Sequence, residues 1–155
     1  MTNPETRLKE AGLSLPEAAA PAANYVPYVV HGAIITVSGQ LPLRDGKMVA
    51  TGRVGDDVSP EMAAEAAQAC GLNIIAQLKA AAGGDLSRID QILRLEAFVA
   101  STDDFTGQPA VVNGASDLMV TAFGEAGKHA RFAVGTNVLP LNAAVEIAAT
   151  AALKS

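Results

Sequence analysis

The stretch that decides the fold is His129-Ala-Arg-Phe-Ala-Val-Gly-Thr-Asn-Val-Leu-Pro-Leu-Asn-Ala-Ala-Val-Glu-Ile147, near the C-terminal end of the chain. Its pattern predicts two β-strands joined by a short link that contains a proline. Because successive side chains in a strand point to opposite faces, Arg131 shares its face with Ala133 and Gly135. In the second strand, Glu146 points away from the branched residues on either side of it. Each strand therefore sets one charge among small neighbours, which indicates a small site for an anionic substrate.

Strand patterns earlier in the chain predict a β-hairpin and a long strand. Residues 26–30 and 33–39 are rich in β-branched side chains and flank His31-Gly32, which is typical of a tight turn. A second turn is expected at Arg44-Asp45-Gly46, because aspartate and glycine tolerate turn conformations. A further strand is predicted over residues 89–100. Its side chains on one face are expected to be Leu93, Leu95, Ala97 and Val99.

Two longer segments carry helix signals. Ser59 suits an N-cap, with proline at the first helical position and glutamate near the positive end of the dipole. This helix should end at Gly83-Gly84, and its apolar stripe comprises Met62, Ala66, Cys70, Ile74 and Leu78. A second helix is predicted from Pro109 to about Glu125, with a stripe formed by Val112, Ser116, Met119 and Phe123. A short helix is expected at residues 4–11.

The composition fits one soluble domain over residues 1–155. A chain of this length can bury a sizeable core, half of its residues are hydrophobic and tryptophan is absent, so the core must be mainly aliphatic. The formal net charge of −5 argues against a nucleic-acid partner, which requires a concentrated positive surface. The polar N-terminus and the lack of an apolar run of about 20 residues argue against a secretion signal or a membrane span. We therefore expect a cytoplasmic protein.

Thiol and metal chemistry gain no support from the sequence. Cys70 is the single cysteine, so it cannot form an internal disulfide, and no cysteine or histidine lies near it at metal-ligand spacing. Its place on a helix stripe indicates a small core residue. No serine stands in the context of a nucleophile elbow, and His129 has no obvious nucleophile partner.

The order of the elements predicts an α+β fold, in which two main helices cover one face of a mixed β-sheet. Consecutive residues are apolar in Ile34-Ile35 and in Phe132-Ala133-Val134. Because consecutive strand residues point to opposite faces, both faces of the sheet are apolar and are expected to be buried. Two helices can cover only one face of so wide a sheet. A partner subunit is the simplest cover for the other face.

The C-terminal motifs resemble those of a known family. Arg131, Leu139-Pro140 and Val145-Glu146-Ile147 are similar to the closing signature of the Rid (YjgF) family of imine and enamine deaminases. The resemblance runs from about residue 20 to about residue 152, and the earlier landmarks follow in order: Ala20-Pro21-Ala22-Ala23, Pro27-Tyr28-Val29, the segment from Ile35 to Pro42, Phe98-Val99 and Asn113. It implies a fold similar to that of Bacillus-type chorismate mutase and a homotrimer with sites at the clefts between subunits.

The resemblance also implies roles for the two charged residues. The family arginine that matches Arg131 holds the substrate carboxylate, and a guanidinium fork suits this task because it can donate two parallel hydrogen bonds. The alternative for Arg131 is a salt bridge at a subunit interface. Glu146 matches the glutamate proposed to position or activate the attacking water. Its alternative is to pair with a cation across the interface.

Further residues are candidates for the pocket wall. Tyr28 matches the family's pocket tyrosine, and its alternative is a half-buried strand aromatic. Asn113 matches an asparagine early in the second helix, where capping or an interface role is also open. Ser38 could bind a pocket water or cap a turn. His129 should share the strand face of Arg131 and could add a titratable group, although a structural role is also open. Some relatives carry a cysteine at the position of Ala133, whose backbone N–H can still donate to a ligand.

The resemblance thus implies hydrolysis of small 2-imino or 2-enamine acids to 2-keto acids and ammonia, without a metal or an organic cofactor, because an iminium is already electrophilic. One alternative is a non-catalytic binder or sensor of 2-keto acids or related small carboxylate metabolites, which would use Arg131 alone. Another is a different substrate, because an N-terminal extension (residues 1–19) and a longer loop at residues 106–109 depart from the short members of the family.

Overall fold

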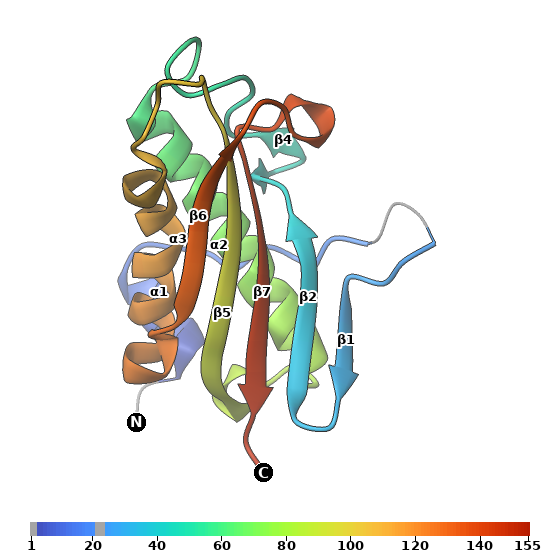
Figure 1. Cartoon of the computed structure of the whole chain (residues 1–155). Coiled ribbons are helices and arrows are strands. Elements are labelled where there is room, and N and C mark those ends of the chain that lie inside the picture. Colours follow the sequence, from blue (N-terminus) through green and yellow to red (C-terminus); the bar gives the residue numbers. More distant parts are fainter. Residues whose placement is uncertain (1–2, 21–23) are drawn as a thin grey trace.

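The computed structural model describes residues 3–20 and 24–155, so the landmark Pro21-Ala22-Ala23 lies outside the described residues. A five-stranded sheet in the order β1-β2-β7-β5-β6 forms one layer (Figure 1). Its strands are β1 (Tyr28–His31), β2 (Ile34–Gln40), β5 (Ile89–Ala100), β6 (Ala130–Thr136) and β7 (Val145–Leu153). Of the sheet's pairings, β5 with β6 is parallel, and the other three are antiparallel. The sheet is therefore mixed, as the sequence predicts.

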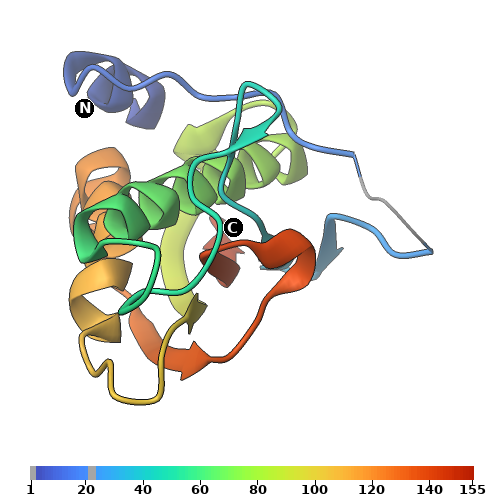
Figure 2. The ribbon, with the colours of Figure 1, turned by 90° about the horizontal axis from the view of Figure 1, so that it is seen from above.

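Three helices accompany the sheet in the described part of the chain: α1 (Pro4–Glu10), α2 (Pro60–Ala81) and α3 (Gln108–Phe123). The view from above shows α2 and α3 side by side on one face of the sheet, with α1 outside them and in contact with α3 (Figure 2). The predicted α+β fold with its two main helices on one face is confirmed. A small hairpin of β3 (Leu43–Arg44) and β4 (Lys47–Met48) and the short 3-10 helices η1 (Leu86–Arg88), η2 (Gly124–Gly127) and η3 (Pro140–Asn142) complete the chain.

Helix α2 begins where its capping residues predict. The Ser59 Oγ accepts a hydrogen bond from the Met62 N–H at 3.1 Å, and proline follows at the first helical position. Met62 itself is 45% exposed, so the apolar stripe begins only at Ala66, one turn later than expected. Gly114 of α3 lets the two helices approach closely, because a Cβ there would lie 2.1 Å from the Ala64 carbonyl oxygen. The two helices therefore pack closely against each other.

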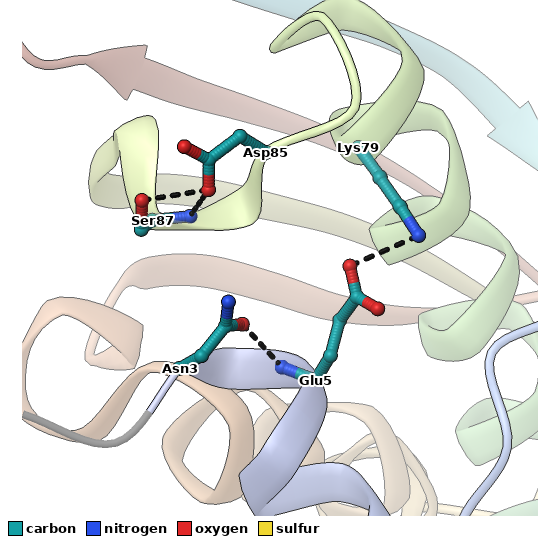
Figure 3. A network of polar contacts seen from close by, with 5 residues as sticks. All are labelled: Asn3, Glu5, Lys79, Asp85 and Ser87. Carbon is teal, nitrogen blue, oxygen red and sulfur yellow. Dashed lines mark hydrogen bonds and ion pairs between the residues drawn. The ribbon is translucent and has the colours of Figure 1, made fainter.

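The N-terminal extension is part of the packed structure. Leu8 of α1 is only 1% exposed and belongs to the hydrophobic core. Asn3 caps α1 through the Glu5 N–H, and Glu5 forms an ion pair with Lys79 of α2 at 3.0 Å (Figure 3). An exposed ion pair contributes little to stability. The burial of Leu8, worth roughly 1.5–3 kcal/mol, therefore contributes most to holding the extension.

Strand β5 shows why one side of the sheet is buried and the other is not. Leu95, Ala97 and Val99 face the helices and are buried. The expected alternation fails at Leu93, which is 37% exposed, because a register irregularity between Ile92 and Arg94 interrupts the pairing of β5 with β7. Ile92 takes the buried position instead.

The opposite face of the sheet carries no helix among the described residues (Figure 2). Phe98 and Phe132 pack there edge to face, with ring centroids 5.5 Å apart. The Arg94 guanidinium lies 5.5 Å from the Phe132 ring centroid. Phe98, Val134 and Ile34 remain about 40% exposed. We call this surface the open face.

No helix in the described residues has the length and apolar character needed to cross a membrane.

Candidate functional site

Arg131 lies on β6, at one edge of the sheet, and points to the side covered by the helices. Its strand partner is Leu95, which is buried against the helix layer. The Arg131 Nη1 donates to the Ser116 Oγ at 3.0 Å, and Nη2 donates to the Pro109 carbonyl oxygen at 3.2 Å. Among the described residues no carboxylate forms an ion pair with Arg131. The guanidinium is thus held by neutral oxygen atoms only.

His129 lies next to this arginine, as the strand alternation predicts. Its Nε2 is 2.8 Å from the Ser116 Oγ, and its Nδ1 is 2.6 Å from the Gly127 carbonyl oxygen. By its spacing in the sequence, Ser116 falls on the helix stripe of Val112, Met119 and Phe123, and His129 has no obvious nucleophile partner. In the structure the half-buried Ser116 side chain turns toward β6 and contacts both His129 and Arg131. The sequence gives no signal for this contact, because α3 and β6 meet only in the tertiary fold.

The α3 flank that faces β6 includes a further predicted residue. Asn113 is exposed and follows Pro109 by four positions, so it lies on the same helix stripe as Pro109 and Ser116. Ala133 shares the face of Arg131 and packs, partly buried, against the core. We call this group of five residues the arginine half-site: Asn113, Ser116, His129, Arg131 and Ala133. The carbonyl of Pro109, in the first turn of α3, accepts the second hydrogen bond of Arg131.

Glu146 lies elsewhere, on the open face of β7, opposite Phe98 of β5. Its side chain is half-buried and extends over Gly39 of β2, where an added Cβ would lie 2.4 Å from the Glu146 Oε1. The register of β2 against β7 shifts between Val37 and Gln40, which is a β-bulge. The bulge and the missing side chain of Gly39 together make room for the carboxylate. The sequence gives no signal for this role of Gly39, because its contact with Glu146 follows from the pairing of β2 with β7.

Burial governs the protonation of this carboxyl group. Desolvation raises the pKa of Glu146 above its usual range, because the charged form loses contact with water. Within residues 3–20 and 24–155, no hydrogen bond or ion pair engages the Glu146 carboxylate. The group is therefore a partly desolvated carboxyl whose oxygen atoms remain available to bind a proton or a water molecule. We call Glu146, Gly39 and Ser38 the glutamate half-site.

Ser38 and Tyr28 position the edge of the sheet beside this half-site. The Ser38 Oγ donates to the Val26 carbonyl oxygen at 2.9 Å, and the Ser38 N–H donates to the Pro27 carbonyl oxygen at 2.9 Å. These bonds hold the segment that enters β1. Tyr28 pairs with Val37 and packs, half-buried, against the core. Roles of Ser38 and Tyr28 in ligand binding stay predictions.

One chain does not bring the predicted site residues together. Arg131 and Glu146 lie on opposite faces of the sheet, and β5 separates their strands. Tyr28 on β1 and Arg131 on β6 occupy opposite edges, roughly 19 Å apart across four strand spacings. A single subunit therefore does not place the arginine and the glutamate in one small site, and the prediction of a site at a cleft between subunits stays a prediction. Alternation shows which residues of one strand share a face. Only the pairing of the strands shows which residues of different strands lie on the same face of the sheet.

Cys70 is a core residue, as predicted. It is fully buried on α2, and its Sγ lies 3.6 Å from the Val145 carbonyl oxygen. Burial, and secondarily the charge of Glu146, raises the pKa of the Cys70 thiol well above its ordinary value. A thiol in this state is a poor nucleophile. In the described residues no three His, Cys, Asp or Glu side chains converge in the manner of metal ligands.

The fold and the comparisons with known proteins identify the class of the protein. A mixed sheet with helices on one face is the α+β architecture that a resemblance to chorismate mutase implies. Residues 5–153 match the family described as "YjgF/chorismate mutase-like, putative endoribonuclease". The chain therefore belongs to the YjgF family, and the prediction made from its motifs is confirmed.

Several relatives cover nearly the whole chain. Protein TCP17 of Trypanosoma cruzi is 46% identical over 149 residues, which are 96% of this chain and 92% of the relative. The crystal structure of Atu1372 from Agrobacterium tumefaciens, of unknown function, is 50% identical with a TM-score of 0.92, covering 97% of this chain and 92% of that one. A crystal structure from Shewanella oneidensis, described as that of "a putative endoribonuclease", is 42% identical with a TM-score of 0.94, covering 98% of this chain and 100% of that one. These relatives establish family and fold but name no established reaction.

Proposed function

We propose that the protein hydrolyses small 2-imino or 2-enamine acids to 2-keto acids and ammonia. The observation that carries this proposal is the state of Arg131, whose guanidinium is held by neutral oxygen atoms and paired with no carboxylate of the described residues. Such a group attracts an external carboxylate. Glu146 supplies the second requirement, because its raised pKa suits a group that accepts and returns a proton.

The two half-sites combine when different subunits supply them. Arg131 lies at the β6 edge, whereas Tyr28, Ser38 and Glu146 belong to the part of the sheet formed by β1, β2 and β7. A head-to-tail contact joins unlike surfaces of identical subunits and closes into a ring when the rotation permits. We propose a homotrimer in which the open face is buried and each cleft contains one arginine half-site and one glutamate half-site. The apolar side chains exposed on the open face support this assembly.

The chemistry follows from the groups in such a cleft. Arg131 binds the substrate carboxylate and orients the adjacent C=N carbon. The substrate enters as the iminium, whose nitrogen already carries the extra proton. Glu146 accepts a proton from a water molecule while the water oxygen attacks that carbon and the C=N π electrons move to nitrogen, which gives a neutral carbinolamine. Glu146 then returns its proton to the nitrogen, the C–N bond breaks to release ammonia, and Glu146 takes the hydroxyl proton as the C–O bond becomes a carbonyl. Transfer of that proton to ammonia gives ammonium and restores the carboxylate. The Ala133 backbone and the Tyr28 ring shape the pocket around the small substrate.

Direct turnover tests the proposal. An amino-acid oxidase generates the unstable imine in the presence of a trapping reagent, and formation of the 2-keto acid is followed with and without the protein. We expect the protein to accelerate 2-keto acid formation and to divert imine from the trap. A wild-type protein that leaves the hydrolysis rates of several imines unchanged would reject the enzymatic function.

A binder or sensor of 2-keto acids is the second candidate function. It is favoured by one observation: the arginine half-site lies within one subunit, on β6 and α3, and needs no contribution from Glu146. Calorimetric binding of a 2-keto acid by a wild-type protein that shows no turnover would make this the better account. The endoribonuclease in the family description gains no support from a chain with a net charge of −5 and no run of Lys or Arg.

A further inference from the structure

A chain of three hydrogen bonds links the backbone of η2 to the guanidinium of Arg131. The Gly127 carbonyl oxygen contacts the His129 Nδ1 at 2.6 Å, the His129 Nε2 contacts the Ser116 Oγ at 2.8 Å, and the Arg131 Nη1 contacts the same Oγ at 3.0 Å. We infer that Ser116 and His129 are positioning residues that fix the Arg131 guanidinium for carboxylate binding. This inference deepens the proposed function and rests on it.

The direction of each hydrogen bond follows from the chemistry of its partners. A backbone carbonyl only accepts, so the His129 Nδ1 must carry a hydrogen and donate it to Gly127. In the neutral ring the Nε2 is then an acceptor, and the Ser116 hydroxyl donates to it. Arginine only donates, so the Ser116 Oγ accepts from the Arg131 Nη1. Each hydrogen is used once and each acceptor receives one donor.

A protonated His129 ring would not satisfy this arrangement. Its Nε2 would also donate to the Ser116 Oγ, which already accepts from Arg131, and the serine hydrogen would lose its acceptor. The charged groups around the ring are Arg131 and Lys128 from its own segment and Asp117 from α3, which line the same hollow. Two cations meeting at one hydroxyl oxygen would repel each other. The geometry therefore selects the neutral ring with its hydrogen on Nδ1.

We call the three hydrogen bonds from Gly127 through His129 and Ser116 to Arg131 the relay. The relay fixes the Arg131 guanidinium but brings no negative charge to neutralise it. Ser116 and the Pro109 carbonyl, both on α3, use two of the five N–H donors of the guanidinium and leave three for a ligand. The adjacent hollow has a volume of about 260 Å³ and is lined by Ser116, Asp117, Val120, Lys128, His129 and Arg131. A side chain held in one orientation loses less conformational entropy when it binds a ligand. Removing the relay should therefore weaken carboxylate binding more than it slows the bond-making step.

Kinetic variants test this prediction against a purely structural role. Ser116→Ala removes the shared oxygen, and alanine favours a helix at least as well as serine, so the protein should remain folded. We expect KM for the imine and Kd for a 2-keto acid to rise about ten-fold, the loss that one hydrogen bond to a charged group implies, while kcat changes less. Ser116→Thr retains the hydroxyl and should restore most of the affinity. Thr121→Ala is the matched control, because the Thr121 hydroxyl lies on the same helix but bonds only to the Asp117 carbonyl oxygen.

Nuclear magnetic resonance tests the relay independently of any reaction. The chain has two histidines, so ¹⁵N-histidine spectra of the wild type and of a His31→Gln variant assign the ring of His129. We expect a hydrogen on Nδ1 and none on Nε2 at pH 7.5, and we expect Ser116→Ala to speed rotation and solvent exchange of the Arg131 guanidinium.

The outcomes separate the two proposals. A hydrogen on the His129 Nε2, or Ser116→Ala kinetics and Arg131 exchange like those of wild type, would overturn the relay even if turnover is normal. A wild type that neither hydrolyses imines nor binds 2-keto acids would overturn the proposed function, and with it the positioning role inferred for Ser116 and His129.

Discussion

In the arginine half-site the charged group is held by hydrogen bonds, whereas in the glutamate half-site it lies in space left by a missing side chain. Arg131 donates to two oxygen atoms of α3, which fix the plane of its guanidinium. Glu146 has no such partner in the described residues, and it extends over Gly39 at a β-bulge. The difference suits the two tasks, because a carboxylate clamp must be fixed in direction while a proton carrier must keep its oxygen atoms accessible.

Removing the arginine should have the largest effect. Arg131→Ala eliminates two charge-assisted hydrogen bonds to the substrate, worth roughly 1.5–3 kcal/mol each, so kcat/KM should fall about 10²- to 10⁴-fold. The half-buried edge position predicts little loss of stability. Arg131→Lys should also be poor, because an ammonium group cannot reproduce the fork. The imine assay, with circular dichroism as the control for folding, measures both variants; near-normal turnover would show that Arg131 is no clamp.

Glu146→Gln should separate binding from chemistry. The amide keeps the shape of the side chain but cannot accept a proton, so we expect turnover to fall about 10²- to 10⁴-fold while 2-keto acid affinity stays close to that of wild type. Calorimetry and the imine assay provide the two readouts. If the variant turns over as fast as the wild type, the enzyme remains but another group must handle the proton.

Mixing the two inactive variants tests whether the half-sites come from different subunits. In hybrid trimers of Arg131→Ala and Glu146→Gln chains, some clefts should receive an intact arginine half-site and an intact glutamate half-site, so activity should partly recover. Co-expression with two affinity tags isolates the hybrids, and sedimentation checks that the wild type is a trimer at micromolar concentration. Complementation would fail if each site used both residues of one chain, and a stable monomer would remove the basis for a shared site.

How far the sequence predicts this site depends on what side-chain periodicity can show. Apolar spacing and turn residues predict the position of α2, the hairpin of β1 and β2, and the face that Arg131 shares with His129 and Ala133. Periodicity places Ser116 on a helix stripe with Val112, Met119 and Phe123, but it cannot show the contact with Arg131, because β6 comes to lie beside α3 only through its pairing with β5. Bulges are a second limit, since one extra residue changes which side chains share a face.

Gly39→Ala should reduce activity through Glu146 alone. The added methyl group would meet the Glu146 Oε1 at 2.4 Å, so the carboxylate must move, and we expect turnover to fall about ten-fold or more with 2-keto acid binding unchanged. The double variant Gly39→Ala with Glu146→Gln serves as the control. Its activity should equal that of Glu146→Gln, because residues that act through one group are not additive. An additive loss would mean that Gly39 acts on the backbone instead.

The smallest expected effect concerns pH and stability in the glutamate half-site. Burial raises the pKa of Glu146 in the folded state above its unfolded value, so folding favours the protonated form. This contribution to stability is fully present below the unfolded pKa and is lost as the pH rises through the raised folded pKa. Glutamine resembles the protonated acid and does not titrate. We therefore expect Glu146→Gln to unfold at the same temperature as wild type in acid and about 1–2 °C higher at neutral pH, the shift being small because the group is half-solvated. Calorimetric scans at several pH values measure the difference, and a variant less stable than wild type at neutral pH would indicate that the carboxylate has a cationic partner from another subunit.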